Sequence, residues 1–169
     1  SAYDAGLLTA SRELAAYFET VAGKADPKQA ANWITGELSG YLNEHNLDIA
    51  DSPLKPDALI WLIGRISDGT ISGKIAKEVV FCDLWDGKIV GVANITLPAL
   101  ALEAQGHAYI EARGLKQLSD SGEIEKIVDQ VIATNAQQVA DYRNGKEKAF
   151  NSLVGQVMKA TRGKANPQQ

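Results

Sequence analysis

The segment Asn151-Ser-Leu-Val-Gly-Gln-Val-Met-Lys-Ala-Thr-Arg-Gly-Lys-Ala-Asn-Pro167 says most about how this chain folds. Apolar residues recur in it at helical spacing, which predicts a helix over about 146–162 that buries Phe150, Leu153, Val154, Val157 and Met158. Lys159 and Arg162 lie three residues apart in the last turn, so we expect them to share a helix face, with Lys148 further back. Gly163 is the expected stop, and Lys164 follows it.

The charge of the chain is unevenly distributed. The 169 residues hold 17 basic and 21 acidic side chains, a net charge of −4. Residues 143–169 carry a single acidic side chain and +5 net, whereas residues 1–142 carry −9. Such asymmetry indicates a local site for a polyanion on an acidic body. Its candidate residues are Arg143, Lys146, Lys148, Lys159, Arg162 and Lys164; a solvated basic surface is the ordinary alternative.

The bulk composition is that of an ordinary globular protein, with 45% hydrophobic and 22% charged residues. No apolar run approaches the ~20 residues that span a bilayer. A lone cysteine, Cys82, permits no internal disulfide and fits a reducing compartment, so we expect a cytoplasmic protein without membrane contact. Met158 is the only methionine, and we expect the chain to be a fragment of a longer protein.

The periodicity predicts an all-α protein of short helices followed by a small three-helix module. Expected helices cover about 4–22, 27–44, 56–67, 72–85, 98–113, 120–134, 135–144 and 146–162. Asp26-Pro27 is a strong start signal, and Asp68-Gly69, Asp86-Gly87 and Gly114 are expected stops. Residues 88–97 read as a strand or an extended linker. We predict two domains, 1–113 and 114–169, with an unusual segment at 88–113.

No group of residues in the sequence supports catalysis or metal binding. Gly69-Thr-Ile-Ser-Gly-Lys74 has one residue too few between its glycines for a phosphate loop, so Gly69 reads as a helix stop and Ser72 as a helix start. The two histidines lack further ligands at metal-binding spacing, and Cys82 lacks a neighbouring base. The three tryptophans read as core residues. We therefore predict no catalytic and no metal-binding residue.

Several runs of sequence resemble one known family. The segment quoted first, Ser119-Asp-Ser-Gly-Glu-Ile-Glu125, Ile71-Ser-Gly-Lys-Ile-Ala-Lys-Glu-Val79 and Tyr3-Asp-Ala-Gly-Leu-Leu-Thr-Ala-Ser11 occur here in the family's order. Together they make the chain similar to the C-terminal tail of the B subunit (GatB) of aspartyl/glutamyl-tRNA amidotransferase. That tail is a helical region followed by a small YqeY-like domain. The segment 88–113 looks longer here than in that family.

The resemblance implies a part in tRNA-dependent amidation. In that family ATP and Mg²⁺ activate the carboxylate of an amino acid mischarged onto tRNA(Asn) or tRNA(Gln), and glutamine supplies the nitrogen. The residues for that chemistry precede the tail, so we expect no cofactor and no catalysis in this fragment. The expected partners are the tRNA, held through the six basic residues, and the A and C subunits. The alternative is a module in which residues 88–113 dock other subunits without tRNA contact.

Overall fold

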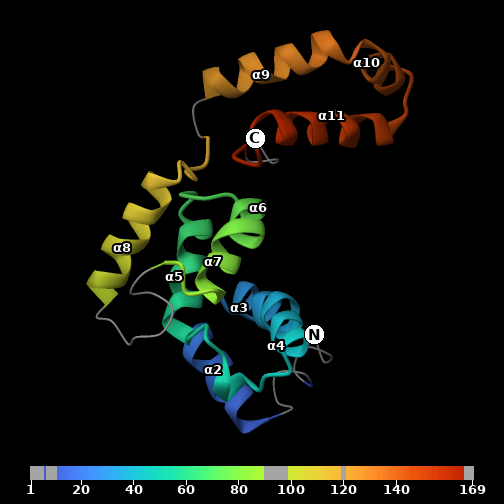
Figure 1. Cartoon of the computed structure of the whole chain (residues 1–169). Coiled ribbons are helices and arrows are strands. Elements are labelled where there is room, and N and C mark those ends of the chain that lie inside the picture. The colour runs from blue at the N-terminus through green and yellow to red at the C-terminus, as the bar shows by residue number, and fades with distance from the viewer. Residues whose placement is uncertain (1–5, 7–10, 90–98, 119–120, 166–169) are drawn as a thin grey trace. The chain divides into compact units, whose positions relative to one another are not determined.

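The computed structural model describes residues 6, 11–89, 99–118 and 121–165, and over these ranges it confirms the all-α prediction. They contain no strand and only one isolated bridge, between Leu118 and Ala165. The chain divides into two compact units: unit 1 comprises 1–68 and 76–114, and unit 2 comprises 69–75 and 115–169. The predicted domains 1–113 and 114–169 stay a prediction, because this division does not test whether either part folds alone. Figure 1 shows the helices.

The first described helix of unit 1 is α2 (Arg12–Ala22). Ser11 has extended backbone angles (φ −136°, ψ 157°), and its hydroxyl accepts a hydrogen bond from the Leu14 N–H. A serine in that conformation is an N-cap, so the prediction of one helix running from Asp4 through Ser11 to Ala22 was wrong. The other residues before Ser11, apart from Gly6, lie outside the described part.

The second helical stretch confirms its start signal. The Asp26 carboxylate caps α3 (Pro27–Trp33), with the proline at the first position. The chain continues through a π-helical segment, η1 (Ile34–Leu38), into α4 (Ser39–His45), which ends at Asn46 in the left-handed conformation (φ 52°). A short 3₁₀ turn, η2 (Ile49–Asp51), follows. The sequence did not indicate the π segment.

The core of unit 1 lies around α5 (Pro56–Ser67), the π-helical η3 (Ala76–Val80) and α7 (Phe81–Trp85). Trp61 and Trp85 are 3% and 7% exposed, which confirms them as core residues. The Trp33 ring stacks on Phe81 at 5.6 Å between ring centroids. The fully buried large side chains of this unit are Val21, Ile34, Leu38, Leu54, Leu59, Leu62, Ile63, Val80, Phe81, Leu84 and Ile110.

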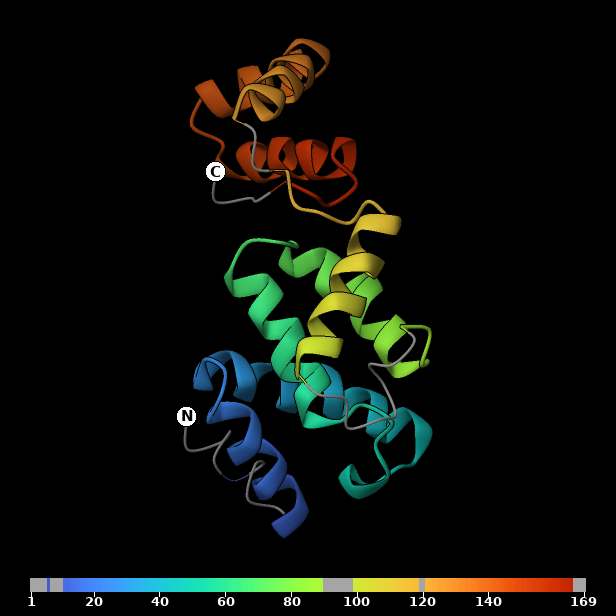
Figure 2. The same ribbon diagram turned by 90° about the vertical axis from the view of Figure 1, so that its left-hand side faces the viewer.

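The helix α8 (Ala99–Ala112) packs against α5 (Figure 2). Gly106 faces Trp61 so closely that a Cβ on the glycine would lie 2.2 Å from the indole ring. Arg65 of α5 pairs with Glu103 at 3.0 Å and contacts the His107 ring nitrogen at 2.8 Å. A strand or extended linker was predicted for residues 88–97, of which 90–97 lie outside the described residues.

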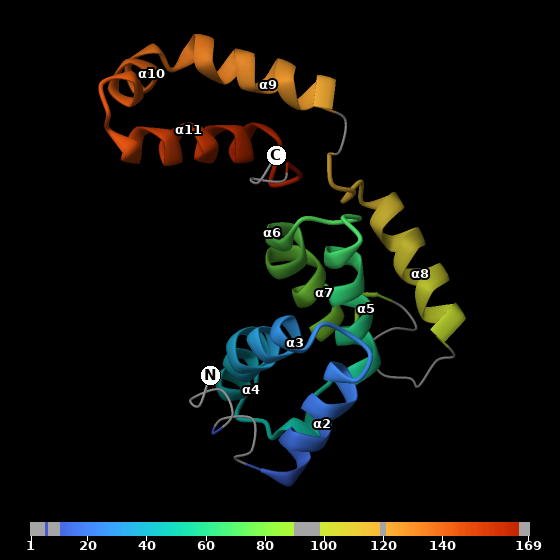
Figure 3. The same ribbon diagram turned by 180° about the vertical axis from the view of Figure 1, so that it is seen from behind.

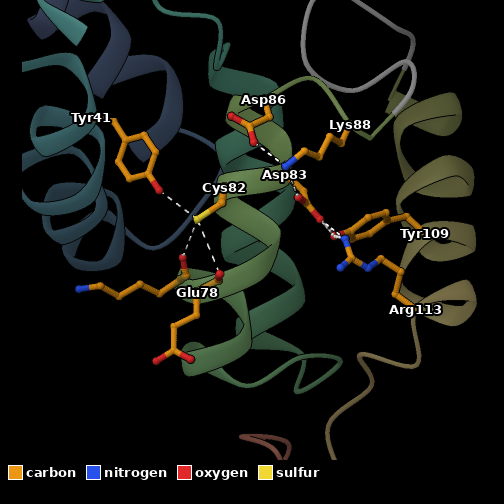
Figure 4. A network of polar contacts seen from close by, with 9 residues as sticks. Tyr41, Glu78, Cys82, Asp83, Asp86, Lys88, Tyr109 and Arg113 are labelled. Carbon is orange, nitrogen blue, oxygen red and sulfur yellow. Dashed lines mark hydrogen bonds and ion pairs between the residues drawn. The ribbon is translucent and has the colours of Figure 1, made fainter. Parts of the chain in front are cut away.

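A buried carboxylate fastens α8 to α7 (Figure 4). Asp83, 6% exposed, accepts hydrogen bonds from the Tyr109 hydroxyl at 2.5 Å and from the Arg113 guanidinium, and Lys88 lies 3.2 Å away. Burial opposes ionisation of Asp83, but these partners outweigh it and hold the pKa of the carboxyl below its usual value. The Asp83 carboxylate on α7 therefore connects that helix to α8 and to Lys88.

Unit 2 is built on α9 (Ser121–Thr134), α10 (Ala136–Arg143) and α11 (Glu147–Ala160), which confirms the three-helix module. α9 and α11 lie side by side and α10 links them (Figures 1 and 3). The short α6 (Gly73–Ile75) also belongs to this unit. Phe150 is 50% exposed, so its predicted burial was wrong, and Leu153, Val154, Val157 and Met158 are only partly buried. The residue of α11 that is buried is Ala149.

Replacing Gly106 by alanine should destabilise unit 1 by about 1–3 kcal/mol, because the new methyl group overlaps the Trp61 ring. Gly64→Ala in α5 is the matched control, since nothing lies within 4 Å of its Cβ position. That control should be neutral or stabilising by up to ~1 kcal/mol. Urea unfolding monitored by tryptophan fluorescence measures both. Equal midpoints for the two variants would contradict the close packing of α8 on α5.

The depressed pKa of Asp83 predicts a loss of stability in acid. The unfolded chain binds the proton more readily than the folded one, so stability is present above the ordinary aspartate pKa of ~3.9 and falls as pH drops below it. Asp83→Asn should lower the free energy of unfolding at pH 7 by about 1–3 kcal/mol and flatten this acid dependence. Asp57→Asn, which breaks an exposed pair with Lys24, should change little. Urea unfolding at pH 7 and pH 3 measures the free energy of unfolding of both variants.

Candidate nucleic-acid interface

The six predicted basic residues form two groups at opposite ends of α11. Arg143 ends α10, Lys146 precedes α11 and Lys148 lies in its first turn. Lys159 lies in the last turn, with Arg162 and Lys164 just beyond it. At 1.5 Å per residue, Lys148 and Lys159 are about 17 Å apart along the helix. The six residues therefore fall into two groups of three, one at each end of α11.

The chain beyond α11 turns sharply, and we call residues 161–165 the hook. The Arg162 N–H donates to the Lys159 carbonyl and the Gly163 N–H donates to the Met158 carbonyl, a pattern that closes a helix end. Arg162 occupies the left-handed position of this motif (φ 53°), where glycine is the usual residue. The helix ends at Ala160, so the prediction that Lys159 and Arg162 share a helix face was wrong.

The hook is anchored to a segment far away in the sequence. The Ser72 hydroxyl donates to the Gly163 carbonyl at 2.5 Å, and the Leu118 N–H donates to the Lys164 carbonyl at 2.9 Å. The Ser72 hydroxyl also accepts from the Ile75 N–H, which confirms the predicted helix start. Ser72 and the residues at 161, 163 and 165 are buried. The backbone of the hook is therefore held in a fixed position, with the exposed Arg162 between buried neighbours.

Lys74 is a basic residue that the sequence analysis did not place at this site. Its side chain runs beside Gly163, since a Cβ on that glycine would lie 3.2 Å from the Lys74 Cδ. The Lys74 side chain is exposed, so its ammonium group adds to the charge around the hook. We call Lys74, Lys159, Arg162 and Lys164 the hook cluster. A pattern of local spacing cannot reveal Lys74, because 89 residues separate it from Gly163.

Ion pairing is more frequent among the basic residues of unit 1 than among the six candidates. Five of the eight basic side chains of unit 1, at positions 24, 65, 77, 88 and 113, form ion pairs with carboxylates, and those at 12, 28 and 55 form none with the described residues. Of the six candidates in unit 2, Lys146 pairs with Asp141 at 2.9 Å, whereas the other five form no ion pair within the described part of the chain. Unit 2 as a whole carries nine basic and six acidic side chains, a net charge of +3.

An open groove of about 490 Å³ lies between α9 and α11, and Lys159 lines it. Its other walls are apolar or carry uncharged amides and a hydroxyl: Ile127, Gln130, Val131, Thr134, Asn135, Gln156 and Ala160. Asn135 lies at the N-cap position of α10, and its side-chain amide donates to the Val131 carbonyl near the end of α9. The groove thus places hydrogen-bonding groups beside Lys159, a member of the hook cluster.

The remaining chemical candidates are occupied by contacts within unit 1. The Cys82 thiol lies 2.9 Å from the Tyr41 hydroxyl, and this hydrogen bond, with burial, raises the pKa of Tyr41 to about 12 (Figure 4). The described residues contain no group of three or more side chains able to hold a metal ion. In the same ranges, the helices are too short or too polar for a membrane crossing.

Comparison with known proteins identifies the family of this chain. A family model described as GatB domain matches residues 16–169. The chain belongs to this family. It is 56% identical over 170 residues to the B subunit of the aspartyl/glutamyl-tRNA(Asn/Gln) amidotransferase of Thiobacillus denitrificans, a match that covers all of this chain and 32% of the relative.

The B subunits of the same enzyme from Bordetella petrii and Cupriavidus taiwanensis are 56% identical over 174 residues and 52% identical over 172 residues. Both matches cover this whole GatB-family chain and 33% of the relative. The chain therefore spans about a third of the length of the curated relatives it matches. The resemblance in the sequence is confirmed at the level of the family.

The left-handed Arg162 predicts that Arg162→Gly stabilises unit 2, by about 1 kcal/mol, because glycine adopts this conformation without a Cβ clash. Asn46→Gly in unit 1 is the matched control, since asparagine already tolerates the same region (φ 52°) and its replacement should gain less. Thermal unfolding by calorimetry measures both. A lower midpoint for Arg162→Gly would show that the arginine side chain stabilises the hook.

Proposed function

We propose that this GatB-family chain is the tRNA-holding tail of an amidotransferase B subunit that acts in the cytoplasm. The hook cluster and the basic group at the start of α11 bind the phosphates of a tRNA while its charged end reaches an active site elsewhere in the protein. The observation that supports this most is the set of five candidate cations without an ion pair in the described residues. Phosphate contacts set register without reading sequence.

The physical role of such a tail is positioning. A tRNA fixed by its body presents its reactive end at a high effective concentration, so binding energy is converted into rate at a distant site. The proposed chemistry of the whole protein is the ATP- and Mg²⁺-dependent amidation of aspartate or glutamate on mischarged tRNA(Asn) or tRNA(Gln), with nitrogen from glutamine. The A and C subunits are its proposed partners. The tail contributes no catalytic group to that proposal.

The alternative function, docking of subunits through residues 88–113, has less support. The described side chains that could serve it, His107 and Tyr109, are engaged by Arg65 and Asp83 of unit 1. A helix fastened by its polar residues to its own unit offers fewer groups to a partner. The five candidate cations of unit 2, in contrast, form no ion pair in the described residues.

Reversing charge at the hook should weaken tRNA binding. The double variant Lys159→Glu, Arg162→Glu in the complete amidotransferase should lose about tenfold or more in tRNA affinity at low salt. Two lost phosphate contacts should also reduce the slope of log affinity against log salt by about 1.4–1.8. Filter binding across a salt series measures both. Glutamine hydrolysis without tRNA should continue at the wild-type rate.

The matched control reverses two exposed lysines of unit 1. Lys28→Glu, Lys55→Glu changes the net charge by the same amount but leaves the hook intact. It should lower affinity only through the long-range field, by a factor well below that of the hook variant. Equal losses for the two double variants would show that overall charge, and not the hook, controls binding.

A further inference from the structure

Two aromatic side chains lie half exposed where α10 meets α11. Tyr142 is 49% and Phe150 is 50% exposed, their ring centroids are 5.5 Å apart and the ring planes are inclined by 37°. In the described part of the chain, Ile132 at 44% is the other large hydrophobic side chain with comparable exposure. We call Tyr142 and Phe150 the aromatic pair. Keeping such rings in water is unfavourable, and a binding partner that covers them recovers that free energy.

Basic residues lie close to the aromatic pair along the chain, together with the acidic Asp141 and Glu147. Arg143 follows Tyr142 directly, Lys146 lies one turn before Phe150, and Lys148 is in the same turn as Phe150. Lys146 is partly neutralised by Asp141, but Arg143 and Lys148 form no ion pair in the described residues. An exposed apolar surface with cations nearby is complementary to a ligand that carries both flat apolar rings and negative charge.

A second groove, of about 480 Å³, adjoins this surface between α9 and α10. Small or apolar side chains line it, together with Arg143 and Asn144. Arg143 therefore belongs both to the groove and to the border of the aromatic pair. Guanidinium and amide groups beside an apolar wall can hydrogen-bond the edge of a planar heterocycle whose faces are stacked.

The exposed apolar area is too small for a stable protein interface. An aromatic side chain covers roughly 150–250 Å², so two half-exposed rings offer on the order of 200 Å². A specific protein–protein contact buries about 800 Å² on each partner. One or two stacked bases need only the area that the rings provide, because base–aromatic stacking works one ring at a time.

We propose that the aromatic pair stacks on one or two unpaired bases of the bound RNA, while Arg143, Lys146 and Lys148 hold the flanking phosphates. This inference rests on the proposed function and adds the class of RNA feature that unit 2 recognises. Bases inside a duplex are stacked on one another and hidden, so the pair accepts only bases turned out of a loop or bulge. The hook cluster, at the other end of α11, contacts backbone alone.

The test separates stacking from charge with two probes. Tyr142→Leu and Phe150→Leu, singly and together in the complete amidotransferase, keep an apolar side chain but remove the ring. Anisotropy at low ionic strength measures binding to an unmodified tRNA(Gln) transcript and to a blunt RNA duplex with the same number of phosphates. The double variant should lose about five- to hundredfold in affinity for the transcript and less than about twofold for the duplex.

The conservative variants Tyr142→Phe and Phe150→Tyr retain a ring and should bind the transcript as the wild type does. Thermal midpoints of all variants should agree closely, because each ring is half exposed and a leucine keeps the remaining contact. The hook variant Lys159→Glu, Arg162→Glu is the reference for charge, and it should weaken both probes.

Three outcomes overturn the inference. Leucine variants that bind the transcript normally show that no base stacks there, and if the hook variant still weakens binding, the proposed function survives. Equal losses on transcript and duplex show a non-specific effect. Leucine variants that keep tRNA affinity but lose a protein subunit of the amidotransferase in gel filtration identify a protein interface instead. If the leucine variants and the hook variant all bind the transcript as the wild type does, both proposals are overturned.

Discussion

The hydrogen bond from the Ser72 hydroxyl to the Gly163 carbonyl is the contact on which unit 2 depends, because it joins two segments 91 residues apart. The three helices of that unit bury little of their own. Its buried hydrophobic residues in the described chain are Ile71, Ile75, Val131, Ala149 and Ala165. Two of them belong to the segment that carries Ser72, and a third to the hook. A module with so small a core needs such cross-links, since buried area alone would not offset the entropy of ordering its chain.

The same contact determines where charge can be placed. A folded protein normally neutralises its cations or lets them extend into water, and unit 1 neutralises most of its own through ion pairs. In unit 2 the exposed Arg162 instead lies on a hook whose backbone is fixed at Ser72 and Leu118. The left-handed conformation of Arg162 costs stability. Strain of this kind that is retained in a fold is a reason to look for a function.

The sequence predicted those features that one or two residues determine locally. Asp26-Pro27 starts a helix wherever it occurs, Ser72 caps α6, and Gly69, Gly87 and Gly114 all adopt positive φ at the stops expected of them. Features that depend on distant residues were missed. Phe150 has the spacing of a buried residue, yet the small core of unit 2 leaves it half exposed. Lys74 reaches the hook only through tertiary structure, and the hook itself bends at an arginine one residue before the expected glycine.

The length of α11 fixes the distance between the aromatic pair and the hook cluster. A helix of 14 residues is about 21 Å long and stiff, so the aromatic pair and the hook cluster are held at a fixed separation within one unit. A ligand that engages both must offer an aromatic face and a backbone of negative charge at that spacing. Binding at one end then raises the effective concentration of the ligand at the other, and the two weak contacts become one selective contact. Free phosphate or a simple polyanion satisfies only the hook. A folded RNA with unpaired bases satisfies both ends, and for this reason the proposed tRNA role and the proposed base contact fit one helix.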